Sequence, residues 1–340
     1  MRDLSTYSTV AEMKAWPADE PRPFAAVLLF LRAIVRKARN GNEFLVVELG
    51  DKSGMFSATC FQDSAAFALF SELAEGTIVR VEGATERYQG KFSPRFSAVG
   101  RFSDEEVAAG NWLAKLIEAA PEDATKLWDE MQEMIADIAH EGLRATTKQV
   151  FETMGDRFRV APAATAMHHA YRHGLLEHTV HVTRVARALL PLYPEVDPSL
   201  AVAGTLLHDV GKAIEYVGEL AAKKSRVGVL QGHVVLGYRI ARQAAMKAKP
   251  ALESDMLERL EHIILSHQGE LEWGAAALAA TPEAVFVAMC DNFDAKMGMV
   301  QQALRNTPAT QEFSDYLPGL KISLVTTPPG VPPPTANPPA

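Results

Sequence analysis

The sequence predicts a multidomain α+β protein in which a small β-barrel is followed by an all-helical domain. Between Pro21 and Phe102, short runs rich in Val, Phe and Thr are separated by turn residues, a pattern typical of strands. From Ser103 onward, apolar residues recur every three to four positions, which is the period of a helix. A chain of 340 residues is long enough for two such domains.

The composition is that of an ordinary globular protein, with 48% hydrophobic and 22% charged residues. The longest apolar run, residues 24–35, is interrupted by Arg32 and is too short for a membrane span, so we expect no membrane association. The N-terminus lacks the apolar core of a signal peptide, and we expect a cytoplasmic location. Cys60 and Cys290 lie far apart and provide neither a disulfide framework nor a cysteine-based zinc site.

The charge is spread unevenly along the chain. The net charge of −8 argues against a nucleic-acid partner, yet residues 30–101 carry ten Lys and Arg against eight Asp and Glu. This local excess permits a cationic surface in the first third of the chain. An excess of this size is also typical of an ordinary solvated surface.

The first third contains about five strand-like runs, separated by turn pairs such as Asn40-Gly41. One helical insertion is expected near residues 64–74. Five strands with one helix suggest a small closed barrel such as the OB-fold. We assign this barrel to residues 21–102 and an N-terminal extension to residues 1–20.

The helical domain is expected over residues 103–317. Its first segment opens with Ser103 as an N-cap, followed by an acidic first turn, and the apolar spacing continues to about Leu304. After Val325, seven of the last fifteen residues are proline, which excludes helix and sheet. We therefore expect residues 318–340 to form a disordered tail.

Polar residues interrupt several of the apolar helical segments. All ten histidines lie at or after His140. The polar residues with the most apolar surroundings are His178, His208, Asp209, His233, His267 and Asp291. Each alone has an ordinary interpretation as a hydrogen-bonded core or surface residue. Convergence on one centre explains all of them at once, because a buried carboxylate such as Asp209 costs several kcal/mol unless cations or donors compensate it.

Imidazole and carboxylate are the ligands that Mn²⁺, Fe²⁺, Co²⁺ and Zn²⁺ accept. Six ligands are too many for one ion that also binds substrate, but they suit two ions bridged by one carboxylate, an arrangement that clamps a phosphoryl group and activates water. Asp209, beside His208, is the expected bridge. Lys212 follows His208 by four residues, so we expect it on nearly the same helix face, reaching a phosphate oxygen. The alternative is a lysine that faces water.

The ligand pattern resembles that of the HD-domain metal-dependent phosphohydrolase superfamily at His178, His208, Asp209 and Asp291. The residues that resemble the additional ligands of its two-metal members are His233 and His267. The stretches HHAYRHGLLEHT, LLHDVGKAIEY, ILSHQGELEWG and DNFDAKM are similar to motifs of the YhaM-type 3′-to-5′ exoribonucleases, which carry an OB-fold ahead of the HD domain. The resemblance extends from about Pro21 to Leu317.

The resemblance implies a metal-dependent 3′-to-5′ exoribonuclease that hydrolyses single-stranded RNA, with single-stranded DNA left open as a second substrate. It implies two divalent ions, of which Mn²⁺ is favoured over Fe²⁺, Co²⁺ and Zn²⁺, and it makes a homo-oligomer plausible. One ion would be held by His178, His208, Asp209 and Asp291. The other would be held by Asp209, His233 and His267. The expected catalytic residues are Asp209 and Lys212.

Two other interpretations stay open. The protein could be an HD phosphohydrolase of small nucleotides in which the barrel serves only assembly. It could also be a non-catalytic OB module regulated by a degenerate HD domain, although the presence of all six ligands disfavours this.

The sequence departs from the resemblance at two places. His267-Gln268 stands where relatives show a His-His pair, and His173-Gly174 stands where they show Gly-Gly. Gln268 can donate to a phosphate or hold a water, but it is a poor ligand for a transition metal. The substrate contacts that we expect in this domain are His168, His169 and Gln268.

The barrel offers candidates for binding single strands, because aromatic side chains stack on bases and cations follow the backbone. The aromatic candidates are Phe44, Phe61, Tyr88 and Phe92. The cationic candidates are Arg80, Arg87, Lys91 and Arg95. The alternative for any one aromatic is a place in the barrel core.

Overall fold

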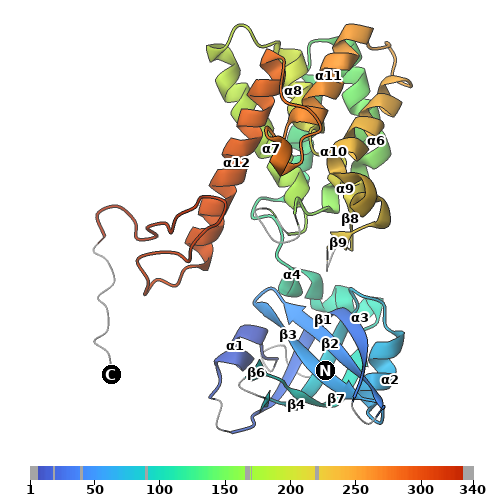
Figure 1. The fold of residues 1–340 in the computed structure, drawn as a ribbon, viewed down its shortest axis with the longest axis vertical. Helices are drawn as coiled ribbons and strands as arrows, with labels where there is room; N and C mark the ends of the chain where they lie inside the picture. Colours follow the sequence, from blue (N-terminus) through green and yellow to red (C-terminus); the bar gives the residue numbers. More distant parts are fainter. Residues whose placement is uncertain are drawn as a thin grey trace. The chain divides into compact units, whose positions relative to one another are not determined.

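The computed structural model describes residues 7–17, 20–38, 41–88, 91–164, 169, 171–218 and 222–331. The chain divides into two compact units whose main boundary lies between Ala119 and Ala120. Figure 1 shows a sheet in the N-terminal unit and helices in the C-terminal one. Within the described ranges, no helix combines the length and apolar character needed to cross a lipid bilayer.

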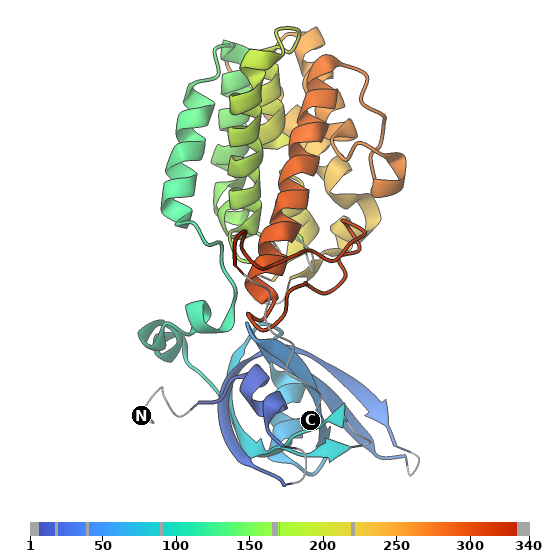
Figure 2. The same ribbon diagram turned by 90° about the vertical axis from the view of Figure 1, so that its left-hand side faces the viewer.

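The first unit is built on a five-stranded antiparallel sheet in the order β3-β2-β1-β4-β7. Its strands are β1 (Pro23–Lys37), β2 (Glu43–Asp51), β3 (Gly54–Phe61), β4 (Ile78–Ala84) and β7 (Arg95–Arg101). A short hairpin, β5 (Arg87–Tyr88) with β6 (Lys91–Phe92), lies between β4 and β7. Figure 2 shows the sheet curling around a helix. The prediction of a five-stranded OB-type barrel is confirmed.

Alternating strand residues fill the barrel core, together with two helices. Helix α2 (Ala65–Glu72), the expected helical insertion, is capped by Ser64, and its Phe70 ring lies 5.3 Å from that of Phe30. Helix α1 (Val10–Ala15) adds Val10 and Met13 to the same core. The segment predicted as an N-terminal extension therefore includes a helix of the barrel.

The first unit ends later than the sequence analysis predicts. Ser103 does cap a helix, α3 (Asp104–Gly110), which is followed by α4 (Trp112–Leu116). Trp112 and Leu116, however, are buried against an outer patch of the sheet formed by Val27, Leu29 and Ile78. Because these helices cover the barrel, residues 103–119 belong to the first unit, and the predicted boundary after residue 102 is too early.

The second unit is helical, as predicted. Its helices are α5 (Ala124–Ala136), α6 (Glu141–Val160), α7 (Gly174–Leu189), α8 (Pro198–Leu207), α9 (Lys212–Glu215), α10 (Arg226–Ala245), α11 (Ser254–Ser266) and α12 (Pro282–Asn306). The short elements are η2 (Leu190–Leu192), η3 (Leu271–Trp273) and the strand pair β8 (Tyr216–Val217) and β9 (Lys223–Lys224). Helix α8 packs against α7, α11 and α12 (Figure 1), and seven of its ten residues are buried.

The apolar run around His208 is not one continuous helix. Helix α8 ends at Leu207 and α9 begins at Lys212, so residues 208–211 form a turn. A Cβ atom on Gly211 would lie 2.0 Å from the carbonyl oxygen of His233, which shows how closely α10 approaches this turn. Glycine is required here, because any side chain would push the two segments apart.

The chain after α12 folds back on itself. Antiparallel bridges join Phe313 to Val325 and Leu317 to Ile322, and the amide of Ser314 donates to the carbonyl of Leu324. Part of the segment predicted as a disordered tail is therefore ordered by backbone hydrogen bonds. Residues 332–340 lie outside the described residues.

Candidate metal centre

The six predicted ligands converge in the helical unit from five separate elements. Their sources are α7 for His178, the turn after α8 for His208 and Asp209, α10 for His233, the end of α11 for His267, and α12 for Asp291. They include two groups able to hold a metal ion, and both groups contain Asp209. The convergence inferred from the sequence is therefore present in the fold.

The first group surrounds the Nε2 atom of His178. This atom lies 3.2 Å from His208 Nε2, 3.4 Å from Asp209 Oδ2 and 3.1 Å from Asp291 Oδ1. Metal–ligand bonds of about 2.1 Å place neighbouring ligand atoms about 3.0–3.4 Å apart. The separations of these side chains therefore fit the edges of a coordination shell.

The second group uses the other oxygen of Asp209. The Nε2 atoms of His233 and His267 each lie 3.5 Å from Asp209 Oδ1. Neither oxygen of Asp209 makes a hydrogen bond of normal geometry with any described residue, although the carboxylate is only 1% exposed and Lys212 Nζ lies 2.6 Å from Oδ2. A buried carboxylate whose two oxygens each face a pair of imidazoles fits a bridge between two cations.

Backbone carbonyls fix the orientation of two ligand rings. His208 Nδ1 lies 2.7 Å from the carbonyl oxygen of Thr205, and His267 Nδ1 lies 2.8 Å from that of Ile264. Because a carbonyl oxygen only accepts, each Nδ1 carries a proton, so the neutral form of each ring presents its lone pair at Nε2. Both lone pairs are therefore available to a metal ion.

Buried carboxylates have the same role at the other two rings. His178 Nδ1 lies 2.7 Å from Asp294 Oδ2, and His233 Nδ1 lies 2.9 Å from Glu215 Oε2. Carboxylate–histidine pairs of this kind orient metal ligands and raise their basicity. Asp294 and Glu215 are not among the residues predicted from the sequence. Asp294 follows Asp291, and Glu215 follows Lys212, by three positions, and this spacing is the one sequence feature that links them to the site.

Burial and neighbouring charges act in opposite directions on the pKa values of Asp209 and Lys212. Burial alone would raise the pKa of Asp209, but the charge of Lys212, with the His208 and His178 imidazoles beside the carboxylate, outweighs burial and holds this pKa well below its usual range. Burial lowers the pKa of Lys212, yet Asp209 and Asp291 outweigh this and raise it. The carboxylates thus favour positive charge around them, and Lys212 stays protonated.

Lys212 reaches the site by a route other than the predicted one. It does not share a helix with His208, because the turn separates them and Lys212 opens α9. Its amide donates to the carbonyl of Asp209 at 2.9 Å, and its side chain returns to the Asp209 carboxylate. The lysine is almost fully buried, which excludes the alternative of a residue facing water.

His169, which the sequence predicts as a substrate contact, is buried beside the ligand His178 and Asp294. The residue is 4% exposed, with Nδ1 2.8 Å from Glu177 Oε2 and Nε2 3.1 Å from Asp294 Oδ2. The Tyr171 hydroxyl also donates to Glu177. His169 and His178 therefore both contact Asp294 Oδ2. The predicted contact of His168 lies outside the described residues.

The departure at His173 has a conformational explanation. His173 has a φ of +66°, in the left-handed region that favours glycine, the residue usual at this position in the resembled family. Its Nδ1 lies 2.6 Å from the carbonyl oxygen of Arg159, which helps to hold the ring in place. Gly174 is required because an added Cβ would lie 2.0 Å from the carbonyl oxygen of His169.

Gln268, predicted as a substrate contact, lies among the atoms of the second group. Its amide Nε2 is 2.9 Å from His267 Nε2 and 3.3 Å from His233 Nε2. The side chain thus faces the same ring nitrogens as Asp209 Oδ1.

The aromatic candidates of the barrel fall in different places. Phe44 and Phe61 are opposite partners on β2 and β3, with ring centroids 6.4 Å apart, and Phe61 is 61% exposed. Arg36 of β1 is the partner of Phe44 on the other side, so the three residues form one row across the sheet. Phe92 instead packs edge-on against buried Phe56, a position in the barrel core.

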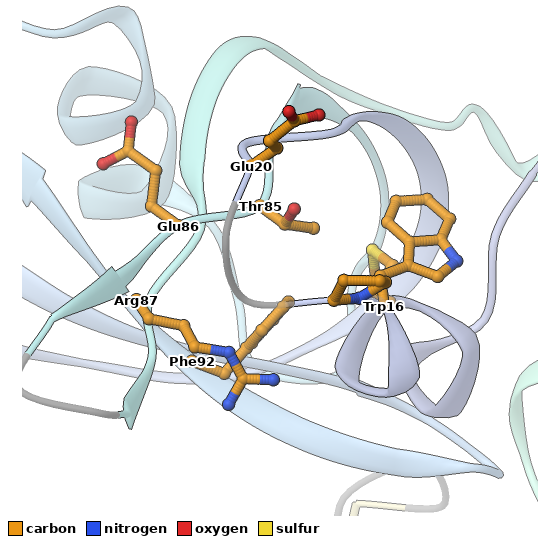
Figure 3. Close-up of a pocket in the computed structure, with 8 residues that line it drawn as sticks. Trp16, Glu20, Thr85, Glu86, Arg87 and Phe92 are labelled. Atoms are coloured by element: carbon orange, nitrogen blue, oxygen red, sulfur yellow. The ribbon is translucent and has the colours of Figure 1, made fainter.

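The cationic candidates lie apart from this row. Arg80, on β4, lies over the ring of Phe102, and Arg95 pairs with Glu86. Arg87 donates to the carbonyl of Lys14 and lines a pocket between α1 and the β5–β6 hairpin, together with the other labelled residues of Figure 3. The predicted residues Tyr88 and Lys91 belong to β5 and β6, and their side chains lie outside the described part of the structure.

Comparison with known proteins identifies both parts of the chain. Residues 30–98 match the family described as OB-fold nucleic acid binding domain, and residues 175–296 match the HD domain family. One similar solved structure is a replication protein A heterotrimer bound to ssDNA, with 15% identity over 32% of this chain and 88% of that chain, and a TM-score of 0.24. Another is the second OB-fold domain of replication protein A from Methanococcus maripaludis, with 15% identity over 29% of this chain and 96% of that chain, and a TM-score of 0.21. The chain therefore joins an OB-fold nucleic-acid-binding domain to an HD domain, the domain of metal-dependent phosphohydrolases.

Proposed function

We propose that this protein is a metal-dependent 3′-to-5′ exoribonuclease that hydrolyses single-stranded RNA. The observation that carries the proposal is the buried Asp209 carboxylate, whose two oxygens face two separate pairs of imidazoles. Such a pair of sites suits a phosphodiester substrate. The OB-fold domain in the same chain supports a polymeric nucleic acid rather than a free nucleotide.

Two divalent ions are assigned to the two groups. The first is held by His178, His208, Asp209 and Asp291. The second is held by Asp209, His233 and His267. Bound ions of this kind supply positive charge to a phosphodiester and activate water as its nucleophile. Mn²⁺ is the ion used in the tests below, because imidazole and carboxylate groups accept it.

The chain's own residues position and stabilise the reacting groups. Lys212 has three ammonium donors, so it can hold Asp209 and donate to a non-bridging phosphate oxygen at the same time. Asp294 and Glu215 keep the rings of His178 and His233 oriented. Because the ligands are largely buried, electrostatic interactions among them are weakly screened by water.

We assign binding of the single-stranded RNA to the barrel. The row of Arg36, Phe44 and Phe61 offers an exposed aromatic surface with a cation beside it. Bases of any sequence can stack on such a surface, while the cation contacts the phosphate backbone of the RNA. A barrel that holds the chain lets the HD domain act repeatedly at one end.

The test is incubation of the Mn²⁺-loaded protein with single-stranded RNA labelled at its 5′ end. The expected result is a ladder that shortens from the 3′ end, and the same assay with DNA measures the second substrate. Turnover of mononucleotides alone would overturn the proposal in favour of a small-nucleotide phosphohydrolase. Binding without any product would indicate a non-catalytic module.

The substitution Asp209→Asn should abolish hydrolysis while leaving binding of single-stranded RNA intact. The amide removes the bridging charge, so the loss of rate should exceed roughly 100-fold, the upper range for changing a residue that only orients a metal ligand. The barrel is unaffected, and a filter-binding titration should give the affinity of the unmodified protein. Near-normal turnover by this variant would refute the bridging role.

The substitution Asp294→Asn should lower Mn²⁺ affinity and activity by roughly 10–100-fold, because His178 loses its carboxylate partner. Asp129→Asn makes the same chemical change at an exposed position of α5, so it is the matched control and should change neither value appreciably. The measurements are calorimetric Mn²⁺ titration and the initial rate on RNA. Equal effects of the two substitutions would argue against the positioning role of Asp294.

The substitution Phe61→Ala should weaken binding of single-stranded RNA by about 1–3 kcal/mol, or roughly 5- to 150-fold, since one stacking surface is lost. Phe313→Ala removes a ring of similar exposure from the second unit and serves as the control. Fluorescence anisotropy with a labelled oligomer measures both affinities. An unchanged affinity for Phe61→Ala would remove this row from the binding surface.

A further inference from the structure

Gln268 occupies a position that a fourth ligand of the second ion would take. It follows His267 directly, at the end of α11. Its amide group lies 2.9 Å and 3.3 Å from the Nε2 atoms of His267 and His233, and Asp209 Oδ1 lies 3.5 Å from each of the same two atoms. The amide and the carboxylate oxygen thus share two neighbours, at separations that match a coordination shell with bonds of about 2.1 Å.

The protonation of the His233 and His267 rings determines which end of the Gln268 amide can face them. Both Nδ1 atoms face acceptors, Glu215 for His233 and the carbonyl of Ile264 for His267, so both neutral rings present lone pairs at Nε2. The amide nitrogen of Gln268 can donate to these lone pairs. A half-turn about the last side-chain bond brings the carbonyl oxygen to the same place, because the two ends of an amide are nearly alike in size. That orientation sets an acceptor against two lone pairs and is stable only with a cation among the groups.

The two groups differ in negative charge. The first contains two carboxylates, Asp209 and Asp291, whereas the second contains only a share of Asp209. Ligand charge count is a main determinant of affinity for divalent ions. A neutral amide adds an oxygen without adding charge, so the second ion is bound more weakly than the first. It also leaves an excess of positive charge at the site, which favours an anionic phosphodiester.

From these contacts we propose that Gln268 ligates the second ion through its amide oxygen, and that the neutral ligand makes this ion the weaker-bound member of the pair. The proposal rests on the metal pair assigned above and extends it to how the pair is loaded. The first ion binds at low concentration, and the second determines the fraction of active protein. Gln268 is therefore a metal ligand in this chain rather than a substrate contact.

The test is calorimetric titration of Mn²⁺ into the full chain and three variants. The unmodified protein should show two binding events, the second at least about tenfold weaker than the first. Gln268→Glu, which adds charge in the same shape, should tighten the second event by about tenfold or more and leave the first unchanged. Gln268→Leu should weaken the second event by a similar factor. Gln149→Leu, on α6, is the control and should change neither event.

The outcomes separate the inference from the function on which it rests. Two events that are insensitive to both Gln268 substitutions would overturn the ligand role while leaving the metal pair intact. Two events of equal affinity would overturn the proposed asymmetry. A single event in the unmodified protein would overturn the metal pair itself. Circular dichroism of each variant, matching that of the unmodified protein, confirms that the comparison is between folded molecules.

Discussion

The buried carboxylate of Asp209 is the constraint on which the helical unit depends. A carboxylate that is 1% exposed costs several kcal/mol unless positive charge compensates it. Lys212 supplies one cation at 2.6 Å from Oδ2, while Oδ1 faces the Nε2 atoms of two imidazoles, His233 and His267, each at 3.5 Å. The arrangement is electrostatically satisfied when cations lie on both sides of the carboxylate, and this same requirement provides the chemistry of a phosphohydrolase.

The fold meets this constraint by bringing distant segments to one point and fixing each ring. The turn after α8 carries Asp209 toward α10, and Gly211 permits the close approach that places His233 beside it. Each ligand histidine has an acceptor at Nδ1, either a carbonyl or a carboxylate, which orients the ring with Nε2 toward the centre. The ligand geometry is therefore determined before any ion binds.

The ligand set could be predicted from sequence because its members are polar residues in apolar helical segments, where burial is expected but hard to explain. Asp294 and Glu215 could not be predicted from the sequence, because their roles follow only from their contacts with the rings of His178 and His233. At His169 a local sequence feature suggested a role that the tertiary structure does not match. Its position before the first ligand helix suggested a substrate contact, whereas tertiary packing turns the ring toward Asp294 and away from solvent.

In the barrel, too, some features follow from local sequence signals and others depend on tertiary packing. Its strands and its capped helix follow from alternation and turn residues, which are local signals. The boundary after Ala119 depends on Trp112 and Leu116 covering an apolar patch of the sheet, and helical periodicity does not reveal which domain a helix covers. Likewise, the aromatic spacing alone did not separate Phe61, which is exposed, from Phe92, which packs against the core.

The central claim, that Asp209 bridges two ions, is tested most directly by electron paramagnetic resonance of the full chain loaded with Mn²⁺. Two ions joined by one carboxylate are magnetically coupled, so the spectrum should be that of an exchange-coupled pair at two ions per chain. The Asp209→Asn variant should lose this coupling. A six-line spectrum of isolated Mn²⁺ at one ion per chain, or at two without coupling, would contradict the account.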